Sequence, residues 1–456
     1  MIILGTNSIK DTGFDVANSC RFDYASSEYV HKTPGSAGSG TKFVFSTWIK
    51  RTKLATAMNI IYAETDTSNY ERIRFVGTDK IEISGVASAS TAYNFATDAV
   101  YRDPSAWMHL HVIRDSTQGT ASNRLKVYVN GVLQALTQDT ALALNYSGFI
   151  NGANVHRIGI GNGEPLGAYL AEVILLDGQV ITPDGNTGEF DSDSGIWKPI
   201  DVSGLTFGTN GFYLDFEDSS NLGNDANGGT DLTEVNLAAT DQSTDTCTNN
   251  FNTPNPLYGM QAIRVPVFAE GNLKITGDGD ANHHQTMGTF AVNKGKWFWE
   301  AKFTVSADIG KNKIGIMSTE LGSPQTDELG DQSGSCLYIN EDGGDFRRDN
   351  ATVDQNAGVC TLNQIVSVAL NMDDGEISIY RAGSLIVDAL AIGNAAGTYV
   401  TPASMHYRDA GMEFNFGSPP YSESGGNSDG NGYGNYSMSV PSGYYSWNTK
   451  NLAEYG

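Results

Sequence analysis

The chain contains 456 residues, of which 52 are glycine and 18% are charged. Its 52 acidic and 28 basic side chains give a formal net charge of −24. Such a surface repels phosphate backbones, so we expect no nucleic-acid partner. The apolar runs are short, are separated by Gly, Asn, Asp and Ser, and never follow a helical period for three turns. This pattern predicts an all-β protein, and the length allows two or three domains.

The start of the chain predicts a protein that is made in the cytoplasm and does not insert into a membrane. The first ten residues, MIILGTNSIK, lack the basic region and the full apolar core of a signal peptide. No apolar stretch approaches the length of a transmembrane helix. We interpret residues 1–19 as an N-terminal arm.

The first domain is predicted over residues 20–216, and its strands alternate apolar and polar residues. A clear alternation covers residues 108–112 and 125–129, and Asn130-Gly131 follows the second run. An Asn-Gly pair favours a type I′ hairpin turn, because both central residues of that turn have positive φ. The region therefore predicts antiparallel β-sheet.

Two further strands of this domain are expected to be strongly buried. Residues 168–176, AYLAEVILL, are apolar on both faces except at Glu172, which predicts a central strand covered on both sides. Residues 212–216, FYLDF, predict a closing strand. Many short strands with turns between them predict two stacked antiparallel sheets, that is, a β-sandwich.

Two segments of the chain are polar and rich in turn-forming residues. Residues 217–270 are rich in Asn, Asp, Thr and Gly, and predict an irregular linker between domains. Residues 421–456 begin as a Gly-rich loop and end in an aromatic segment that contains Trp447. We expect this ending to pack back on a domain.

The second domain is predicted over residues 271–420. Its clearest strand, residues 296–305, reads KWFWEAKFTV. Trp297 and Trp299 share one face with other apolar residues, whereas Glu300 marks a face that we expect to be solvated. This domain is also predicted to be a β-sandwich.

Several segments of the first domain carry a family resemblance, in order and with similar spacing. They are NSCRFDYASSEYVHKTP, FSTWIKR, RDPSAWMHLHVIRDSTQGTASNRLKVYVNGV, YLAEVILLDGQVITP, GIWKPIDVSG and GTNGFYLDFEDSSNLGND. They resemble the laminin-G-like, concanavalin A-like domain that recurs in virion proteins of marine bacteriophages. The linker segment TDQSTDTCTNNFNTPNPL belongs to the same pattern.

The second domain has its own resemblance, carried by NKGKWFWEAKFTV, KIGIM, NMDDGEISIY and FNFGSPPY. These segments resemble a SPRY domain, a bent β-sandwich that binds protein partners through loops at one edge. The ending GYYSWNTKNLAEYG resembles the ending of the same phage proteins. The resemblance implies two antiparallel sandwiches, a concanavalin A-like jelly roll and then a SPRY-like domain. It implies no catalytic residues, so we expect no enzyme.

An acidic segment, DGNTGEFDSD, offers candidate metal ligands at Asp184, Glu189, Asp191 and Asp193. These carboxylates could bind a structural Ca²⁺ ion if the loop curls, because hard cations prefer carboxylate oxygens. The alternative, which we favour, is a solvated acidic turn, since the segment does not fit an EF-hand. The E-x-D motif at Glu189 lacks the second Glu of a retaining glycosidase. We expect no other cofactor.

Two pairs of histidines lie close enough in the sequence to be considered as metal ligands. His109 and His111 face the same way on one predicted strand, but no third ligand is visible, so we expect structural histidines. His283 and His284 are adjacent and point to opposite sides of a strand, which makes a poor pair of ligands. The four cysteines show no metal-binding spacing and are expected to be free thiols.

The expected binding surface lies in predicted loops of the second domain. Aromatic and charged side chains in such loops can stack on sugars or contact a partner protein. The residues that we single out are Asp342, Asp345, Phe346, Arg347, Arg348, Tyr407 and Arg408.

These observations predict a non-enzymatic virion protein of a tailed bacteriophage. The preferred role is a tail-fibre or receptor-binding component that recognises a host-surface glycan or protein. Other virion proteins are the expected partners, and a homo-oligomer or many copies would make weak contacts add up. The alternative is a capsid decoration or head-fibre protein, because no heptad stem or β-helical shaft precedes the lectin-like domain. A polysaccharide-degrading enzyme is a minor alternative.

Overall fold

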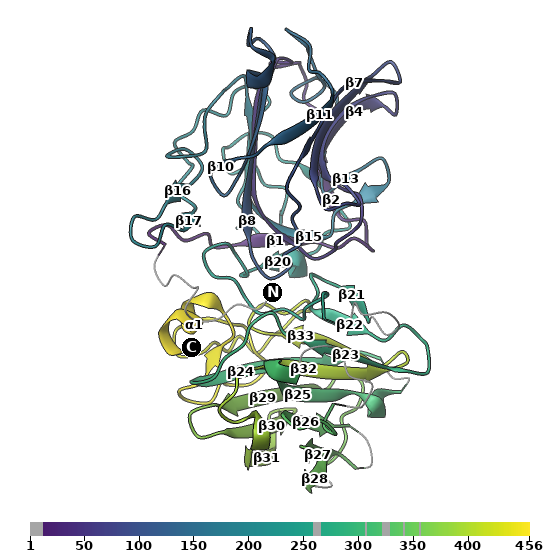
Figure 1. Cartoon of the computed structure of the whole chain (residues 1–456), viewed down its shortest axis with the longest axis vertical. Coiled ribbons are helices and arrows are strands. Elements are labelled where there is room, and N and C mark those ends of the chain that lie inside the picture. The colour runs from purple at the N-terminus through teal and green to yellow at the C-terminus, as the bar shows by residue number, and fades with distance from the viewer. Residues whose placement is uncertain (1–11, 259–265, 306–307, 322–328, 341–342, 355–356) are drawn as a thin grey trace. The chain divides into compact units, whose positions relative to one another are not determined.

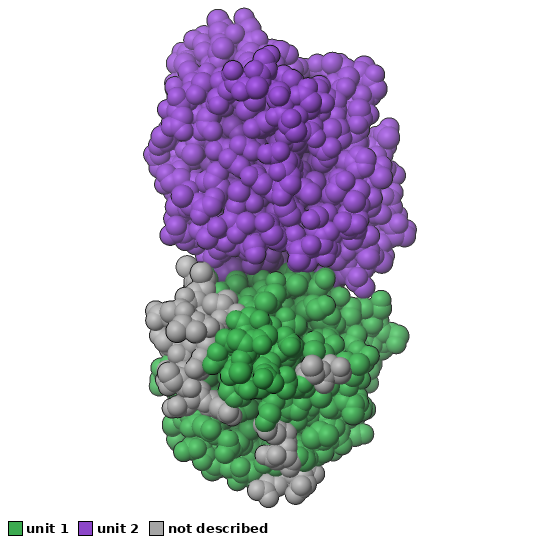
Figure 2. Space-filling model, turned by 90° about the vertical axis from the view of Figure 1, so that its right-hand side faces the viewer, with its two compact units in different colours: residues 1–10, 249–456 green, residues 11–248 purple. Residues whose placement is uncertain are grey.

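Figure 1 shows the computed structural model of the chain, which describes residues 12–258, 266–305, 308–321, 329–340, 343–354 and 357–456. The chain divides into two compact units (Figure 2), an N-terminal unit of residues 11–248 and a C-terminal unit from residue 249 onward. Regular structure in the described residues is almost entirely strand, and the sheets are antiparallel except where one short strand joins in parallel. The predicted all-β class with two sandwiches is confirmed.

The N-terminal unit is a sandwich of two eight-stranded sheets. The first, here the β3 sheet, contains in spatial order β10 (Val132–Leu133), β9 (Leu125–Val129), β8 (Met108–Asp115), β3 (Lys42–Arg51), β15 (Ala168–Asp177), β1 (Ser19–Phe22) and β20 (Gln242–Ser243), with β18 (Phe212–Leu214) beside β15. The second, here the β4 sheet, contains β11 (Leu136–Thr140), β7 (Ser90–Thr97), β6 (Ile81–Ala87), β5 (Asn69–Phe75), β4 (Met58–Asp66), β12 (Val155–Ile158), β2 (Tyr29–Lys32) and β19 (Thr233–Val235). Both sheets contribute to one apolar core, which includes Phe45, Ile61, Leu110 and Ile73.

Short elements complete the N-terminal unit. They are the hairpin of β13 (Ile160–Gly161) and β14 (Glu164–Pro165), the hairpin of β16 (Glu189–Phe190) and β17 (Trp197–Lys198), and the 3-10 helices η2 (Ala121–Asn123) and η3 (Ala239–Asp241). The predicted Asn-Gly turn joins β9 to β10. Asn130 and Gly131 have φ angles of 48° and 74°, and Val129 pairs with Val132 across the turn. The positive φ at both central residues confirms the predicted hairpin.

The segment predicted as a linker is irregular for most of its length but contributes two strands to the N-terminal unit. Within it, β19 pairs with β2 at the edge of the β4 sheet, and β20 pairs with β1 at the edge of the β3 sheet. Residues 217–248 therefore belong to the compact N-terminal unit, and the division between units falls at residue 249. Short edge pairings of this kind are not visible in a composition dominated by Asn, Asp and Gly.

The central strand β15 is buried along all ten residues, as predicted. Its pairing with β3 shifts register between Ala171 and Ile174, and Glu172 has a φ of 51° there, which is the geometry of a β-bulge. Glu172 is 6% exposed, and its carboxylate accepts a hydrogen bond of 2.8 Å from the Tyr213 hydroxyl. Burial raises the pKa of Glu172 to about 8, so the folded protein favours the neutral acid near pH 7.

A buried ion pair joins the two sheets of the N-terminal unit. Arg114 of β8 contacts Glu71 of β5, and both side chains are completely buried. The Glu71 carboxylate also accepts the backbone N–H groups of Phe149 and Ile150, at 3.0 and 2.9 Å. A side chain at Gly148 would overlap both charged groups, with its Cβ 2.2 Å from Arg114 Nη1, so glycine permits this close approach.

The C-terminal unit is also built from two sheets. The first contains β21 (Val267–Ala269), β22 (Lys274–Thr276), β33 (Gly411–Asn415), β24 (Lys296–Phe303), β29 (Ile365–Asn371), β30 (Glu376–Arg381) and β31 (Ser384–Ala391), with β34 (Tyr445–Ser446) parallel to β24. The second contains β23 (His283–Met287), β32 (Val400–Tyr407), β25 (Lys313–Ser318), β26 (Ser335–Ile339), β27 (Asp345–Arg348) and β28 (Ala351–Asp354). The 3-10 helices of the C-terminal unit, among the described residues, are η4 (Ile309–Lys311), η5 (Thr319–Leu321) and η6 (Gly393–Ala395).

The aromatic ending of the chain packs on this unit, as expected. The Trp447 ring lies 5.3 Å from the Trp297 ring and 5.7 Å from the Trp299 ring, in the core between the sheets. The single α-helix of the described chain, α1 (Thr449–Tyr455), follows directly and has seven residues. No helix in the described residues is long and apolar enough to cross a membrane.

The face of β24 that was predicted to be solvated is buried, so that prediction is wrong. Glu300 is fully buried, and its carboxylate accepts hydrogen bonds from the Ser437 backbone N–H and hydroxyl at 3.0 and 2.6 Å. Next to it, Phe298 packs edge to face on Tyr436 with ring centres 5.0 Å apart. The C-terminal segment covers this face, and alternation within one strand cannot reveal cover that comes from more than a hundred residues away.

We expect Arg114→Met to lower the free energy of unfolding by about 3–5 kcal/mol, because the Glu71 carboxylate is then buried without a cation. Urea unfolding followed by intrinsic fluorescence measures the change. Lys42→Met is the matched control: its ion pair with Asp115 spans 3.9 Å, and the lysine side chain is 37% exposed, so we expect a loss of less than about 1 kcal/mol. Equal losses in the two variants would contradict a special role for the buried pair.

We expect Glu172→Gln to stabilise the protein at high pH. A carboxyl whose pKa is raised in the folded state costs no stability at a pH below its pKa in the unfolded state. The loss of stability grows as the pH rises from there through the pKa of the folded state, here about 8. Gln keeps an oxygen for the Tyr213 hydroxyl and cannot ionise, so the variant should gain about 2–4 kcal/mol at pH 8 and almost nothing at pH 4. Unfolding curves across this range measure the difference. The exposed control Asp139→Asn should follow the unmodified protein, and a gain that does not vary with pH would refute the explanation.

Candidate functional site

A pocket of about 280 Å³ opens on the N-terminal unit beside three neighbouring strands. Its apolar part comes from one residue of each strand, Ile49 of β3, Met108 of β8 and Val129 of β9. Arg51 at the end of β3 also lines the pocket, and the rest of the lining comes from the loop between β7 and β8 and the turn after β9. The lining residues from these connections are Val100, Tyr101, Arg102, Asp103, Ala106, Trp107 and Asn130.

Hydrogen bonds hold the aromatic side chains of this loop in place. Trp107 Nε1 donates to Asp245 Oδ1 at 3.0 Å, and the Tyr101 hydroxyl donates to Gln134 Oε1 at 3.0 Å. Asp103 Oδ1 accepts the backbone N–H two residues later at 2.9 Å, which forms an Asx turn. Both rings are half-buried, so each has a fixed polar edge and an accessible apolar part.

Two arginines that line this pocket share the carboxylate of Asp79, which lies behind them and does not line it. Asp79 Oδ1 lies 3.1 Å from Arg51 Nη2, and Asp79 Oδ2 accepts from Arg102 Nε at 2.8 Å. Burial opposes ionisation of Asp79, but the Ala55 N–H and the two guanidinium groups hold its pKa below the usual range. Arg51 is buried, with its guanidinium 4.0 Å from the Phe75 ring centre, whereas the Arg102 side chain is 59% exposed. Arg102 therefore keeps donors available to a ligand.

The pocket has the composition of a binding site for a polar ligand with apolar faces. It combines apolar strand residues and two aromatic rings with two guanidinium groups, a carboxamide and a carboxylate. A glycosidase would need, in addition, a general acid with a raised pKa opposite a second carboxylate. Burial raises the carboxyl pKa of Glu172, Asp241 and Glu300 among the described residues, and none of these lines the pocket.

The structure does not bring the four carboxylates of the predicted calcium site together. Lys198 Nζ lies 3.3 Å from Glu189 Oε1 and 3.5 Å from Asp191 Oδ2. Asp191 Oδ1 also accepts the backbone N–H of Asp193 at 3.2 Å. Asp184, the fourth predicted ligand, does not join them: in the described chain, the one group of three or more potential ligands lies in the C-terminal unit. The cationic group that contacts Glu189 and Asp191 in the structure is thus the Lys198 ammonium.

The predicted surface segment of the second domain is a strand of the sheet rather than a loop. Residues 345–348 form β27, and Phe346 is fully buried in the core, so its prediction as a contact residue is wrong. Strand alternation turns Phe346 inward and leaves Asp345 half-buried on the other face. Asp342 lies outside the described residues.

The two predicted arginines of β27 are engaged within the C-terminal unit. Arg347 Nη1 lies 2.6 Å from Asp331 Oδ1. Arg348 Nη1 donates to the Ala391 carbonyl oxygen at 2.5 Å, and its Nε lies 3.9 Å from Asp349 Oδ2. These contacts give both arginines a structural role at the end of the sheet, although each side chain remains partly exposed.

The remaining predicted residues, Tyr407 and Arg408, lie at the end of β32. The Tyr407 ring lies 4.8 Å from the His283 ring, and the Arg408 guanidinium lies 5.6 Å from the Tyr407 ring centre. On the neighbouring strand, His284 lies close to two aspartates, and these three side chains are the described residues that could hold a metal ion. His284 was not predicted as a ligand, because the adjacent His283 points to the other side of the strand and the two aspartates lie in the loop before it.

The expected structural role of His109 and His111 is confirmed. Both are buried; His109 Nε2 lies 2.8 Å from the Ser46 hydroxyl, and His111 Nδ1 lies 3.0 Å from the Thr187 hydroxyl. His111 Nε2 lies 3.0 Å from the Ile181 carbonyl oxygen, so both of its nitrogens are used. Burial lowers the pKa of both rings, that of His111 to about 4, so both are neutral near pH 7. The described cysteines are free, as expected.

The pocket residues Tyr101, Arg102 and Trp107 were not among the predicted site residues. One signal was available, because they lie together in YRDPSAW, at the start of a segment on which the family resemblance rests. An aromatic and charged loop that joins two strands is a common place for a binding site. The pocket itself depends on β3 and β9 lying beside β8, and a local pattern does not give that arrangement.

Several solved structures are similar to parts of this chain. The SPRY domain of human HERC1 is 16% identical, with 31% of this chain and 87% of that chain covered and a TM-score of 0.25. A candidate carbohydrate binding protein from Bacteroides ovatus is 16% identical, with 48% and 58% covered and a TM-score of 0.35. A SAP-like pentraxin from Limulus polyphemus is 13% identical, with 37% and 80% covered and a TM-score of 0.26.

One family model matches the sequence itself, over residues 25–183. Its description is the concanavalin A-like lectin/glucanases superfamily. The matched segment begins before β2 and ends after β15, and it contains every lining residue of the pocket. Residues 25–183 are therefore similar to concanavalin A-like domains of the laminin G type.

Proposed function

We propose that this chain is a non-enzymatic binding protein and that the pocket beside β3, β8 and β9 binds a glycan. The observation that carries the proposal is the pocket itself, in which Trp107 and Tyr101 stand beside the exposed guanidinium of Arg102. A sugar ring has apolar C–H faces and a rim of hydroxyl groups, so it needs an aromatic surface next to fixed donors and acceptors. Asn130 and Asp103 supply further polar groups.

Binding without hydrolysis is favoured by the charges at the pocket. The superfamily description includes both lectins and glucanases, so the fold alone does not decide between them. Asp79 is held ionised between two guanidinium groups, which makes it a poor general acid. Glu189, in the E-x-D motif of residues 189–191, lies in β16, is paired with Lys198 and does not line the pocket.

We further propose that the chain acts in the virion of a tailed bacteriophage, as a tail-fibre or receptor-binding component that contacts the host surface. This finer role rests on the resemblance of the sequence segments to laminin-G-like and SPRY-like virion proteins. Other virion proteins are the proposed partners. A pocket of about 280 Å³ holds little more than one or two sugar rings, so affinity per site would be weak. Several copies on one particle would raise the overall avidity by about 10²–10⁴.

We expect the purified chain to bind oligosaccharides on a glycan array. The Arg102→Ala variant should bind the same glycans at least about tenfold more weakly, because a charged hydrogen bond contributes about 1.5–3 kcal/mol. Titration calorimetry with the strongest array glycan measures the affinity. Trp107→Phe, which replaces the indole with a smaller aromatic ring, should weaken binding less than Trp107→Ala. Lys53→Ala is the matched control, since Lys53 is exposed and does not line the pocket. Binding that is unchanged in both Arg102→Ala and Trp107→Ala would place the glycan elsewhere and refute the assignment.

The virion role has a separate test. We expect an antibody against this chain to label intact virions of the phage that encodes it at the tail, in a few copies per particle, when labelled particles are counted by electron microscopy. Label spread over the head would instead support a capsid decoration protein. Particles without label would remove the virion role and leave the pocket assignment intact.

A further inference from the structure

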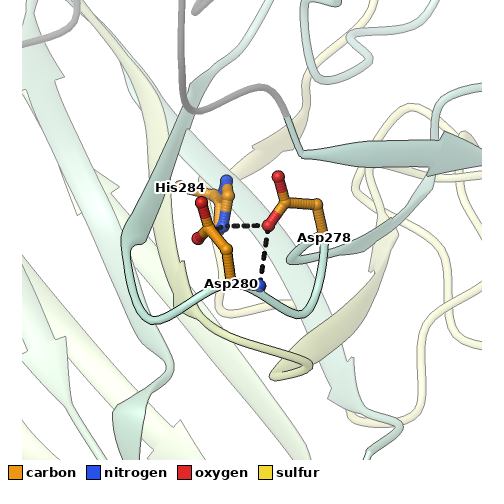
Figure 3. A group of neighbouring side chains, drawn as sticks. All are labelled: Asp278, Asp280 and His284. Atoms are coloured by element: carbon orange, nitrogen blue, oxygen red, sulfur yellow. Dashed lines mark hydrogen bonds and ion pairs between the residues drawn. The ribbon is translucent and has the colours of Figure 1, made fainter.

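We propose that Asp278, Asp280 and His284 bind one divalent transition-metal ion on the C-terminal unit. One ligand atom from each side chain lies within 4.8 Å of the other two. Figure 3 shows the three side chains converging, the aspartates from a loop and the histidine from the adjacent strand. This site is independent of the glycan pocket, which belongs to the N-terminal unit.

The loop that carries the aspartates is fixed against a second connection between the same sheets. Residues 277–282 lead from β22 to β23, and the turn after Tyr407 leads from β32 back to β33. Gly277 N donates to the Ala410 carbonyl at 3.1 Å, and Arg408 N donates to the Asn282 carbonyl at 3.3 Å. A Cβ at Gly277 would lie 1.5 Å from the Arg408 carbonyl oxygen, so glycine is required for this contact.

His284 is the observation that separates this group from an ordinary acidic loop. The ring is completely buried, and neither nitrogen makes a hydrogen bond with any residue that the structure describes. Its Nε2 nevertheless lies 3.1 Å from Asp278 Oδ1 and 3.3 Å from Asp280 Oδ1. The oxygens are therefore close to the nitrogen but off the axis along which an N–H group would donate.

This spacing also fits two ligands of one shared metal ion. With bond lengths of about 2.1 Å and ligand–metal–ligand angles between a right angle and a tetrahedral one, two ligand atoms lie about 3.0–3.4 Å apart. The distances from Asp278 and Asp280 to His284 Nε2 both fall in that interval. A buried imidazole without hydrogen bonds is costly, and a metal bond to Nε2 would remove part of that cost.

The carboxylates are held in position before any ion binds. Asp278 Oδ1 accepts the Asp280 backbone N–H at 3.0 Å, and Asp280 accepts from the backbone and side chain of Asn282 at 3.0 and 2.6 Å. The two aspartate side chains are 36% and 38% exposed, so an ion would keep a side open to water. Neither forms an ion pair with a lysine or arginine of the described chain, and their negative charge remains available to a cation.

The donor set selects the class of metal. One imidazole nitrogen with two carboxylate oxygens suits Zn²⁺ and its first-row neighbours, whereas Ca²⁺ and Mg²⁺ prefer oxygen donors alone. His406, which pairs with His284 across the strands, is not a fourth ligand. Its nitrogens lie 3.0 Å from the Ser404 hydroxyl and 2.9 Å from Asn312 Oδ1, so both are used. Three protein ligands leave an open coordination position.

The test is a titration of tag-free full-length protein, stripped with EDTA and desalted, with ZnCl₂ in a calorimeter. We expect one saturable equivalent per chain, and at least about a tenfold loss of affinity in Asp278→Asn and in Asp280→Asn. CaCl₂ should bind at least tenfold more weakly than ZnCl₂. Asp388→Asn, an exposed aspartate of the same unit, is the control and should bind Zn²⁺ like the unmodified chain.

Two further readouts keep the test decisive. His284 is buried, so a His284 variant could fail to fold; the surface aspartates carry the test, and circular dichroism confirms that they fold. Bound Co²⁺ should give visible d–d absorption that the double variant Asp278→Asn/Asp280→Asn lacks. The proposal is overturned by the absence of a saturable equivalent, by Zn²⁺ binding that survives the double variant, or by Ca²⁺ binding as tightly as Zn²⁺.

Discussion

The buried pair of Glu71 and Arg114 is the interaction on which the arrangement of the N-terminal unit depends. Neither charge reaches water, so each must be satisfied inside the sandwich, and only one relative position of the two sheets achieves this. The same carboxylate accepts two backbone N–H groups from the connection that follows Gly148. Apolar packing would tolerate small shifts between the sheets, but this set of directional contacts does not.

Buried acceptors fasten irregular backbone in the C-terminal unit as well. Glu300 holds the C-terminal segment through the Ser437 N–H and hydroxyl. Asn252 Oδ1 accepts the backbone N–H groups of Thr289 and Phe290 at 2.8 and 3.1 Å. A chain with long connections must satisfy many backbone groups outside its sheet ladders, and one buried side-chain oxygen can satisfy two or three of them. This explains how segments rich in Gly, Asn and Ser are ordered without regular structure.

The outcome of the sequence predictions follows from the range over which each signal acts. The Asn130-Gly131 turn and the central strand around Glu172 were predicted, because turn chemistry and side-chain alternation are local. Glu300 was predicted to be solvated but is buried, because alternation divides a strand into two faces and does not say what covers each one. Phe346 was predicted to lie in a loop, although its segment is a strand that pairs with β26 and β28. Asp278 and Asp280 were not predicted as partners of His284, because they lie in a loop whose path depends on its contacts with the turn between β32 and β33.

The two candidate sites differ in the charge of the groups that remain available to a ligand once their contacts within the protein are counted. At the pocket, two guanidinium groups share the Asp79 carboxylate, and Arg102 retains exposed donors, which favours a ligand rich in oxygen. At the loop before β23, two carboxylates share only a buried imidazole, which favours a cation. In a chain with 52 acidic and 28 basic side chains, unpaired carboxylates are the expected surplus, so exposed acid alone identifies nothing. What distinguishes Asp278 and Asp280 is the buried His284 nitrogen within 3.3 Å of an oxygen of each, because a solvated acidic turn does not require a buried imidazole beside it.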